Sequence, residues 1–600
     1  MPNKLRDIRS EYQGSSPYIV ERNVSVPLAD GGVVRCNVYM PLGARTGCKY
    51  PVIATYGPYG KDVHYQQFHP ASFAQVPDEQ KTDDSGFELP TPLYWTSHGY
   101  VVVRADEIGS GQSPGILSVF SPRMLHAFPT VIEWSSEQSW STGKVGLLGI
   151  SYYATTQWYA AAQSPKGLAA IVPWEGFSDL YRDFIRHGGI LNNFFFSVWF
   201  DRQVKSNQYG RSGKAGRNWG PDTIEGDLSE EELVTTLTNI GEEAKNAPYA
   251  DHPMFASMNI NFDDITVPLL SVGNFGGTGL HLRGNIFAYT HSASEFKYLR
   301  FISGRHDLPF FLPDEVETQR SFLDAFLKGE DREGWSQKGK LPPVSLLLRK
   351  GNPGHNDIAA EAASFFRREE FEWPIARTQY KKLYLTSDLQ LSFDVPSNIT
   401  TKVTYPALDW TTAGHSVSFS TAPFDNEIEI TGHSVLHLRV SVSGVLQNPC
   451  PADIDIFATL RHFTADGEQV FYTGTTGQPV AVTVGSLRVS HRKVDTSHRY
   501  HRVWQPYRSY LSSDVQPVVL NEIYDVDIEI MPTNVVISKG GRLVLEIGSS
   551  DPDHTDVFKH NDPQDRKQGV FGGKNNIHFA PGAHNYLTIP VIPETDVVIV

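Results

Sequence analysis

The chain is poor in cysteine, lacks long hydrophobic runs and has a deficit of positive charge, and each of these absences excludes a class of protein. Three cysteines in 600 residues, Cys36, Cys48 and Cys450, are too few and too scattered for a disulfide framework or a zinc site. No apolar run approaches the roughly 18 residues that a membrane-spanning helix needs. The net charge of -15 argues against nucleic acid or an anionic membrane surface as a partner.

Targeting and cofactor motifs are missing as well. Residues 1–12 are charged and contain no apolar segment of the kind found in secretory signals. Together with the sparse cysteines, this predicts a cytoplasmic location. No H-E-x-x-H, P-loop or dinucleotide-binding pattern is present, so we expect no metal and no cofactor. The sequence does not indicate an oligomeric state, and a homodimer remains open.

What the sequence does contain is a pattern that changes along the chain. The first part alternates buried strands with helices, which is typical of a parallel sheet covered by helices on both faces. This predicts an α/β-hydrolase domain, a doubly wound sheet formed by residues 1–178 and 254–345. Residues 179–253 are helical and loop-rich, and we expect them to form a cap over the active edge. Short β segments separated by turns then predict a jelly roll at 346–600.

The segment Lys144–Ala154 predicts a buried strand, a tight turn and a helix, with Ser151 at the turn. Such a turn lifts the serine oxygen away from the backbone and points the helix N-terminus at any anion formed there. Gly149 and Ala154 supply the small neighbours that a sharp turn requires. A serine that merely caps a helix would fit the same pattern, and the last glycine of the strict G-x-S-x-G motif is missing.

A nucleophilic serine on an α/β sheet needs a histidine on a later loop at the same edge. The predicted strand Tyr298–Ile302 runs directly into a loop that contains His306. The sequence therefore places His306 where a catalytic base is expected.

Four segments of the chain resemble the cocaine-esterase-like hydrolases, a family related to X-prolyl dipeptidyl peptidases and α-amino-acid ester hydrolases. Gly149–Ala154 resembles the family's G-x-S-Y-x-[GA] elbow, and Pro58–Lys61 its P-Y-x-K segment. Asp179–Arg182 resembles its D-L-Y-R segment, and Gly541–Asp551 a strand near the end of its jelly roll. The resemblance spans nearly the whole chain, in the domain order α/β-hydrolase, helical cap and jelly roll.

The resemblance implies a role for each catalytic candidate. Ser151 would attack a carbonyl carbon, while His306 would take its proton and pass it to the leaving group. The oxyanion would be held by the backbone N–H of Tyr152 and by the hydroxyl of Tyr59, and one such donor typically contributes about 10²–10³ in rate. The expected partner is therefore a small-molecule acyl substrate.

The acid that would orient the histidine departs from the family pattern. The family usually carries an aspartate in the loop after the strand Val267–Val272, where this chain has Gly276. The neighbouring predicted strand ends at Glu175, on the same edge and one strand nearer to Ser151. We predict that Glu175 orients His306, with Asp179 and Asp307 as fallback candidates.

These residues predict a metal-independent serine hydrolase that cleaves an ester or amide through an acyl-enzyme. An acyltransferase or a lactone-forming enzyme would use the same triad. A third alternative is a catalytically weak scaffold whose jelly roll serves as a binding module, which the missing aspartate favours and the retained Ser151, His306 and Tyr59 oppose. The aromatic segment Phe194–Phe200 fits either the core of the cap or the wall of an apolar pocket.

Overall fold

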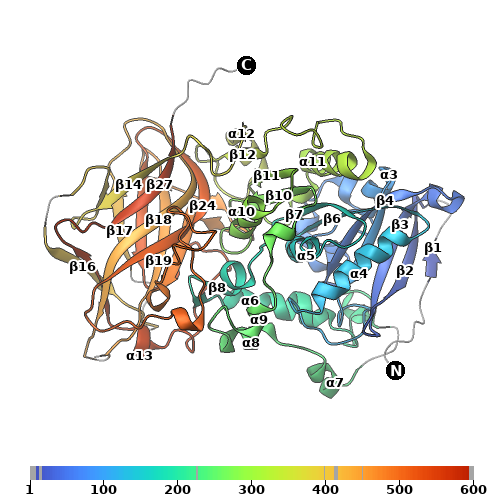
Figure 1. Cartoon of the computed structure of the whole chain (residues 1–600), viewed down its shortest axis with the longest axis horizontal. Helices are drawn as coiled ribbons and strands as arrows, with labels where there is room; N and C mark the ends of the chain where they lie inside the picture. Colours follow the sequence, from blue (N-terminus) through green and yellow to red (C-terminus); the bar gives the residue numbers. More distant parts are fainter. Residues whose placement is uncertain are drawn as a thin grey trace.

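Two large β structures lie side by side in the molecule, with shorter helices between and beneath them (Figure 1). The computed structural model describes residues 9–11, 16–223, 228–396, 399–410, 416–446, 448 and 450–593. Most of the N-terminal stretch considered above for a secretory signal lies outside this set. Within the described residues, no helix is long and apolar enough to cross a lipid bilayer.

The first β structure is an eleven-stranded sheet in the described part of the chain, and it carries the α/β-hydrolase fold. Its central strands are parallel and almost entirely buried, because helices cover both faces. In spatial order the strands are β1 (Arg9–Glu11), β2 (Tyr18–Pro27), β3 (Val33–Pro41), β5 (Val101–Asp106), β4 (Tyr50–Gly57), β6 (Ser141–Ile150), β7 (Leu168–Trp174), β10 (Leu269–Asn274), β11 (Lys297–Ile302), β12 (Val344–Leu348) and β13 (Phe366–Glu370).

The helices divide between the two faces and create two separate hydrophobic cores. On one face, α3 (Pro92–Ser97) and α11 (Pro313–Leu323) bury Trp95 and Phe322 against the sheet. The other face is covered by α4 (Met124–Glu137), α5 (Tyr152–Ala161) and α10 (Leu282–His291). Since parallel strands end at the same edge, the loops after β4, β6, β7, β10 and β11 gather there.

The first sheet extends further along the chain than predicted. The expected boundary at 345–346 falls inside β12, which pairs in parallel with β11. Strand β13 then pairs antiparallel with β12 from Val344–Glu370 to Leu348–Phe366. The sheet therefore ends at Glu370, because β13, the pairing partner of β12, lies in the segment that the sequence assigned to the jelly roll.

The cap lies between β7 and β10 and is made of short elements. They include a π-helical turn (Leu180–Ile185), the hairpin β8 (Arg186–His187) and β9 (Ile190–Leu191), and the helices α6 (Phe194–Trp199), α7 (Glu230–Thr235), α8 (Ile240–Asn246) and α9 (Pro253–Ala256). The hairpin contacts the second β structure, where Arg488 donates its backbone N–H to the carbonyl of Gly188 over 2.9 Å.

The second β structure is a largely antiparallel jelly roll, as the sequence predicts. Its longest pairing joins β18 (Ile428–Ser443) to β24 (Tyr524–Ile537), and β18 also pairs with β26 (Lys574–Phe579) and β27 (Tyr586–Ile592). Further strands include β14 (Gln379–Leu385), β16 (Thr401–Pro406), β17 (Ser416–Thr421), β19 (Asp455–Phe463), β23 (Thr483–Arg488) and β25 (Arg542–Gly548). The extra pairings of β18 fold this sheet back on itself.

Candidate active site

Ser151 occupies a strained turn between β6 and α5. Its backbone has φ 62° and ψ -116°, a conformation that non-glycine residues rarely adopt and that is typical of functional sites. The turn leaves no room for a larger neighbour, since a Cβ added at Gly149 would lie 2.6 Å from the Cβ of Tyr153. Tyr152 is the first residue of α5, so its backbone N–H precedes the intrahelical hydrogen bonds. The predicted strand–turn–helix is therefore present, with an N–H beside the serine.

Glu175 and His306 meet at the edge where β7 and β11 end. Glu175 Oε2 lies 2.9 Å from His306 Nδ1, and the Glu175 side chain is fully buried. The amide of Asn274, the last residue of β10, donates to Glu175 Oε1 over 3.3 Å. This carboxylate therefore fixes the His306 ring with its proton on Nδ1, leaving Nε2 as the edge that can exchange a proton.

His306 faces a second carboxylate on its other side. Its Nε2 lies 3.3 Å from Oε1 of Glu88, a buried residue in the segment before α3. Burial lowers the pKa of His306, but the charges and hydrogen bonds of Glu175 and Glu88 outweigh it and raise the pKa well above its usual value. Burial raises the pKa of Glu88 to about 7, against the opposing influence of His306.

The hydroxyl of Ser151 contacts a different histidine, His281. Ser151 Oγ and His281 Nε2 are 3.2 Å apart, whereas the structure shows no hydrogen bond between Ser151 and His306, both of which it describes. The backbone N–H of Phe177 donates to His281 Nδ1 over 3.2 Å, so the proton of His281 must sit on Nε2. Burial, reinforced by the charge of His306, lowers the pKa of His281 well below its usual value. His281 is therefore a neutral donor to Ser151.

The two imidazole rings lie against each other. The centroids of His281 and His306 are 5.0 Å apart and their planes differ by 13°. His306 thus packs on the ring that holds the serine, and both histidines belong to one cluster at the active edge.

Tyr59, the predicted oxyanion donor, lies beside the turn. The indole N–H of Trp199 in the cap donates to its hydroxyl oxygen over 2.8 Å, which leaves the phenolic proton free to point elsewhere. Burial raises the pKa of Tyr59 well above its usual value, so this proton stays in place. The Tyr59 ring packs edge-on against Tyr152 and Tyr153, with centroids 5.8 and 5.6 Å away.

Comparison with known proteins identifies the family of the chain. The sequence profile of the X-Pro dipeptidyl-peptidase S15 family matches residues 30–306, and that of the X-Pro dipeptidyl-peptidase C-terminal non-catalytic domain matches residues 336–588. The chain belongs to this family. It is accordingly a serine hydrolase that acts on ester or peptide-type bonds.

Relatives of this S15-type hydrolase extend over its whole length. Cocaine esterase from Rhodococcus sp. (strain MB1 Bresler) is 24% identical, with 96% of this chain and 99% of the esterase covered. A solved CocE/NonD family hydrolase from Staphylococcus aureus superimposes with a TM-score of 0.81 at 25% identity, covering 96% of this chain and 94% of that one. An α-amino acid ester hydrolase shares the fold at 16% identity, with a TM-score of 0.62 and coverage of 97% and 98%.

The structure gives a physical reason for glycine at the position where the resemblance calls for an aspartate. A Cβ added at Gly276 would lie only 1.9 Å from the carbonyl oxygen of Thr473 in the jelly roll. The loop after β10 is therefore pressed against the second β structure and has no space for a side chain. A Cβ added at Gly277 would lie 3.4 Å from Glu175 Oε2, so the Glu175 carboxylate already occupies the space beside this loop.

Neither fallback acid contacts His306. Asp307 accepts hydrogen bonds from Arg305 Nε over 2.7 Å and from the hydroxyl of Tyr65 over 2.9 Å. Asp179 forms an ion pair with the Arg182 side chain and accepts a hydrogen bond from the Arg182 backbone N–H. Both carboxylates are engaged elsewhere, so among the described residues Glu175 and Glu88 are the acids that contact His306.

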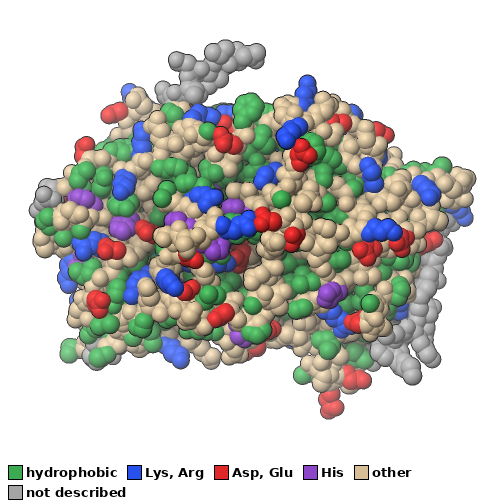
Figure 2. Space-filling model, viewed as in Figure 1, with side chains coloured by type: hydrophobic (Ala, Val, Ile, Leu, Met, Phe, Trp, Pro, Cys, Tyr) green, Lys and Arg blue, Asp and Glu red, His purple; other side chains and the backbone are tan. Residues whose placement is uncertain are grey.

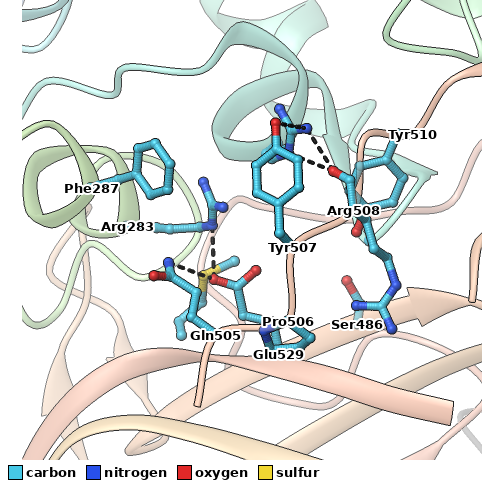
Figure 3. A pocket seen from close by; sticks show the side chains of 12 residues that line it. Arg283, Phe287, Ser486, Gln505, Pro506, Tyr507, Arg508, Tyr510 and Glu529 are labelled. Carbon is cyan, nitrogen blue, oxygen red and sulfur yellow. Dashed lines mark hydrogen bonds and ion pairs between the residues drawn. The ribbon is translucent and has the colours of Figure 1, made fainter. Parts of the chain in front are cut away.

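The D-L-Y-R segment instead serves the junction between the cap and the jelly roll. Arg182 donates to the carbonyl oxygen of Arg508 over 2.6 Å at a cavity between the domains. In Figure 3, Arg283 and Gln505 converge on Glu529, and the Arg283 Nε–Glu529 Oε1 distance is 3.0 Å. Arg182 also pairs with Asp179, and Arg283 with Asp183, so ion pairs and hydrogen bonds connect the cap and α10 to the jelly roll at this cavity.

The aromatic segment Phe194–Phe200 contributes to both the cap core and the site. Trp199 stacks on Phe120 at 6.2 Å and on Tyr152 at 6.4 Å, and it holds Tyr59. Phe194 lies on the outer side, with 42% of its surface exposed. The cap therefore supplies apolar rings next to the predicted oxyanion donor.

Sequence reasoning missed His281 and Glu88. His281 precedes α10 in the loop after β10, and the edge position of that loop was the signal that could have identified it. Glu88 lies in a loop before a helix, at φ 64°, with no strand end to mark it. A buried acid in such a segment has no recognisable spacing in the sequence.

Proposed function

We propose that this S15-type hydrolase cleaves a small-molecule acyl substrate through an acyl-serine intermediate. Ser151 is the nucleophile, His306 the general base and then acid, and Glu175 the carboxylate that orients His306. The observation that carries the proposal is the coincidence, at one sheet edge, of the strained Ser151 turn with the Glu175–His306 pair at 2.9 Å.

The first step transfers the Ser151 proton to His306 Nε2 while Oγ attacks the carbonyl carbon. The imidazolium is stabilised by Glu175, and the oxyanion by the Tyr152 backbone N–H and the Tyr59 hydroxyl. His306 then returns its proton to the leaving group, and a water molecule releases the acyl group by the same route in reverse.

This sequence of steps requires Ser151 to exchange its contact with His281 for one with His306. Catalytic hydrogen bonds are often long or misaligned in a free enzyme and tighten when substrate binds. His281 is unsuited to the role of base, because its Nε2 already carries a proton and its Nδ1 is held by Phe177. Its donated hydrogen bond instead fixes Ser151 Oγ between reaction cycles.

The aromatic rings beside Tyr59 support an apolar acyl or alcohol group as part of the substrate. Phe120, Tyr152 and Trp199 are buried and pack on one another next to the Ser151 turn. Apolar walls with a few aimed polar groups are typical of small-molecule sites. We also propose a cytoplasmic location, in keeping with the three free cysteines.

A fluorophosphonate probe tests the nucleophile directly. The folded wild-type protein should be labelled and should hydrolyse 4-nitrophenyl esters, and Ser151→Ala should abolish both. Ser139→Ala, at an exposed turn, is the matched control and should behave as the wild type. Labelling that persists in Ser151→Ala would refute the proposed nucleophile, and a folded wild type that is never labelled would favour the non-catalytic scaffold.

Hydrolysis and acyl transfer share these steps and differ only in the acceptor. Added alcohols should capture a minor part of the acyl group if water is the natural acceptor. Capture of most of the acyl group at millimolar alcohol would instead identify an acyltransferase.

A further inference from the structure

Glu88 is buried beside the triad residues, although it takes part in no step of the proposed mechanism. Its side chain is 3% exposed, and its Oε1 is the group that faces His306 Nε2, the edge from which a base must act. Its Oε2 is buried and has no hydrogen-bond partner among the described residues. A buried, half-satisfied carboxylate is costly to keep ionised, so its position calls for an explanation.

The backbone of Glu88 is tied to the nucleophile turn. Its carbonyl accepts the N–H of Ile150, the residue before Ser151, over 3.2 Å. Its φ of 64° is unfavourable for a residue with a side chain, and such strain persists where the surroundings enforce it. The backbone of Glu88 is thus fixed in position relative to the Ser151 turn.

We propose that Glu88 is a positioning residue that shares one proton with His306 Nε2 and thereby sets the lower pH limit of the hydrolase. This inference rests on the proposed function, because it concerns the base of that reaction. With the proton present, it lies between Glu88 Oε1 and His306 Nε2, and the lone pair of Nε2 cannot accept the proton of Ser151. When the proton leaves to solvent, Nε2 is free and Glu88 is an anion beside it.

The neighbours of the pair determine the direction of the effect. Glu175 and Asp307 are anions near Glu88 and favour retention of the shared proton, whereas His281, packed on His306, is neutral and adds no charge beside the pair. The phenols of Tyr59 and Tyr153 lie close to Glu88, and their raised pKa values keep them neutral. Removing the charge of Glu88 takes away one of the two carboxylates that stabilise the imidazolium, so the base should lose its proton at lower pH.

The test is the pH profile of kcat/KM for 4-nitrophenyl acetate and of the fluorophosphonate labelling rate. Glu88→Gln keeps the shape of the side chain and should move the acidic limb down by about one pH unit or more in both profiles. Glu107→Gln is the matched control, because Glu107 is equally buried, has its pKa raised by burial to about 8, and contacts Tyr152 rather than His306. Its acidic limb should stay in place whatever its activity.

A shift of less than about 0.3 pH units in Glu88→Gln, with an active enzyme, would overturn the inference. Lower activity with an unmoved limb would have the same meaning, since a purely structural role predicts that result. The titration of His306, followed by NMR of ¹³C-labelled histidine and assigned with His306→Asn, supplies a readout that needs no turnover. The pKa of His306 measured in this way should fall in Glu88→Gln even if the wild type hydrolyses no ester. In that case the proposed function fails and the inference of a shared proton stands. An unchanged pKa of His306 overturns the inference.

Discussion

Glu175 is the residue whose replacement separates the proposed triad from its alternatives. Glu175→Gln keeps the contact with Asn274 but removes the charge that stabilises a protonated His306. We expect kcat to fall by about 10²–10⁴-fold with little change in KM, because the lost interaction acts mainly in the transition state. Steady-state kinetics on a 4-nitrophenyl ester, with folding checked by circular dichroism, provide the measurement.

Asp307→Asn is the companion variant for this prediction. Asp307 is buried and bonded to Arg305 and Tyr65, so its loss should lower stability more than turnover. Equal, small effects of the two substitutions on kcat would discard Glu175 as the orienting acid.

His281 and His306 make distinguishable predictions although their rings are stacked. His281→Phe preserves an aromatic ring for stacking but removes the hydrogen bond to Ser151. Because Ser151 gives up this bond before it reacts, its loss should change kcat by less than about threefold. His306→Asn removes the base and should cost at least 10³-fold. Comparable losses in both variants, measured on the same ester, would mean that His281 is itself the base.

At the scale of elements, the loop after β10 is shaped by its contact with the jelly roll. Gly276→Ala places a Cβ 1.9 Å from the Thr473 carbonyl, and such overpacking should cost about 1–3 kcal/mol of unfolding free energy. Thermal denaturation should show a lower melting temperature. Gly216→Ala, where nothing lies within 4 Å of the added Cβ, should show no such loss, and equal melting temperatures for the two variants would contradict the steric account.

The same loop shows where sequence reasoning succeeded and where it could not. The parallel strands are continuous apolar runs, so the sheet, the Ser151 turn and the loops carrying Glu175 and His306 could be read from the sequence. The steric conflict at Gly276 involves Thr473, almost 200 residues away, and no local pattern encodes it. Similarly, β13 belongs to the first sheet only because β12 offers it an edge, so the predicted boundary at 345–346 fell too early.

At the scale of the whole molecule, the three parts are joined by charged contacts that cross their boundaries. On the face seen in Figure 2, acidic and basic side chains are interspersed rather than segregated. Beneath the surface, Asp565 of the jelly roll accepts from Arg186 of the cap hairpin over 2.8 Å and from Arg488 over 2.9 Å. Arg186 and Arg488 are both buried, so Asp565 neutralises charge that water cannot reach.

Removing this carboxylate should loosen the cap from the jelly roll. We expect Asp565→Asn to lower the unfolding free energy by about 3–5 kcal/mol at neutral pH, because the buried Arg186 loses its counter-ion and Arg488 keeps only Asp455. Although burial opposes its ionisation, Arg488 and Arg186 lower the pKa of Asp565 below its usual value of 3.8. Its contribution is therefore complete above about pH 4 and declines as the pH falls further, so the difference between wild type and variant should shrink from pH 7 to pH 3. Asp263→Asn, which breaks the exposed pair with Arg499, is the control and should leave the melting temperature nearly unchanged. A similar response of the two variants, or a difference that does not depend on pH, would show that the buried contact does not hold the cap in place.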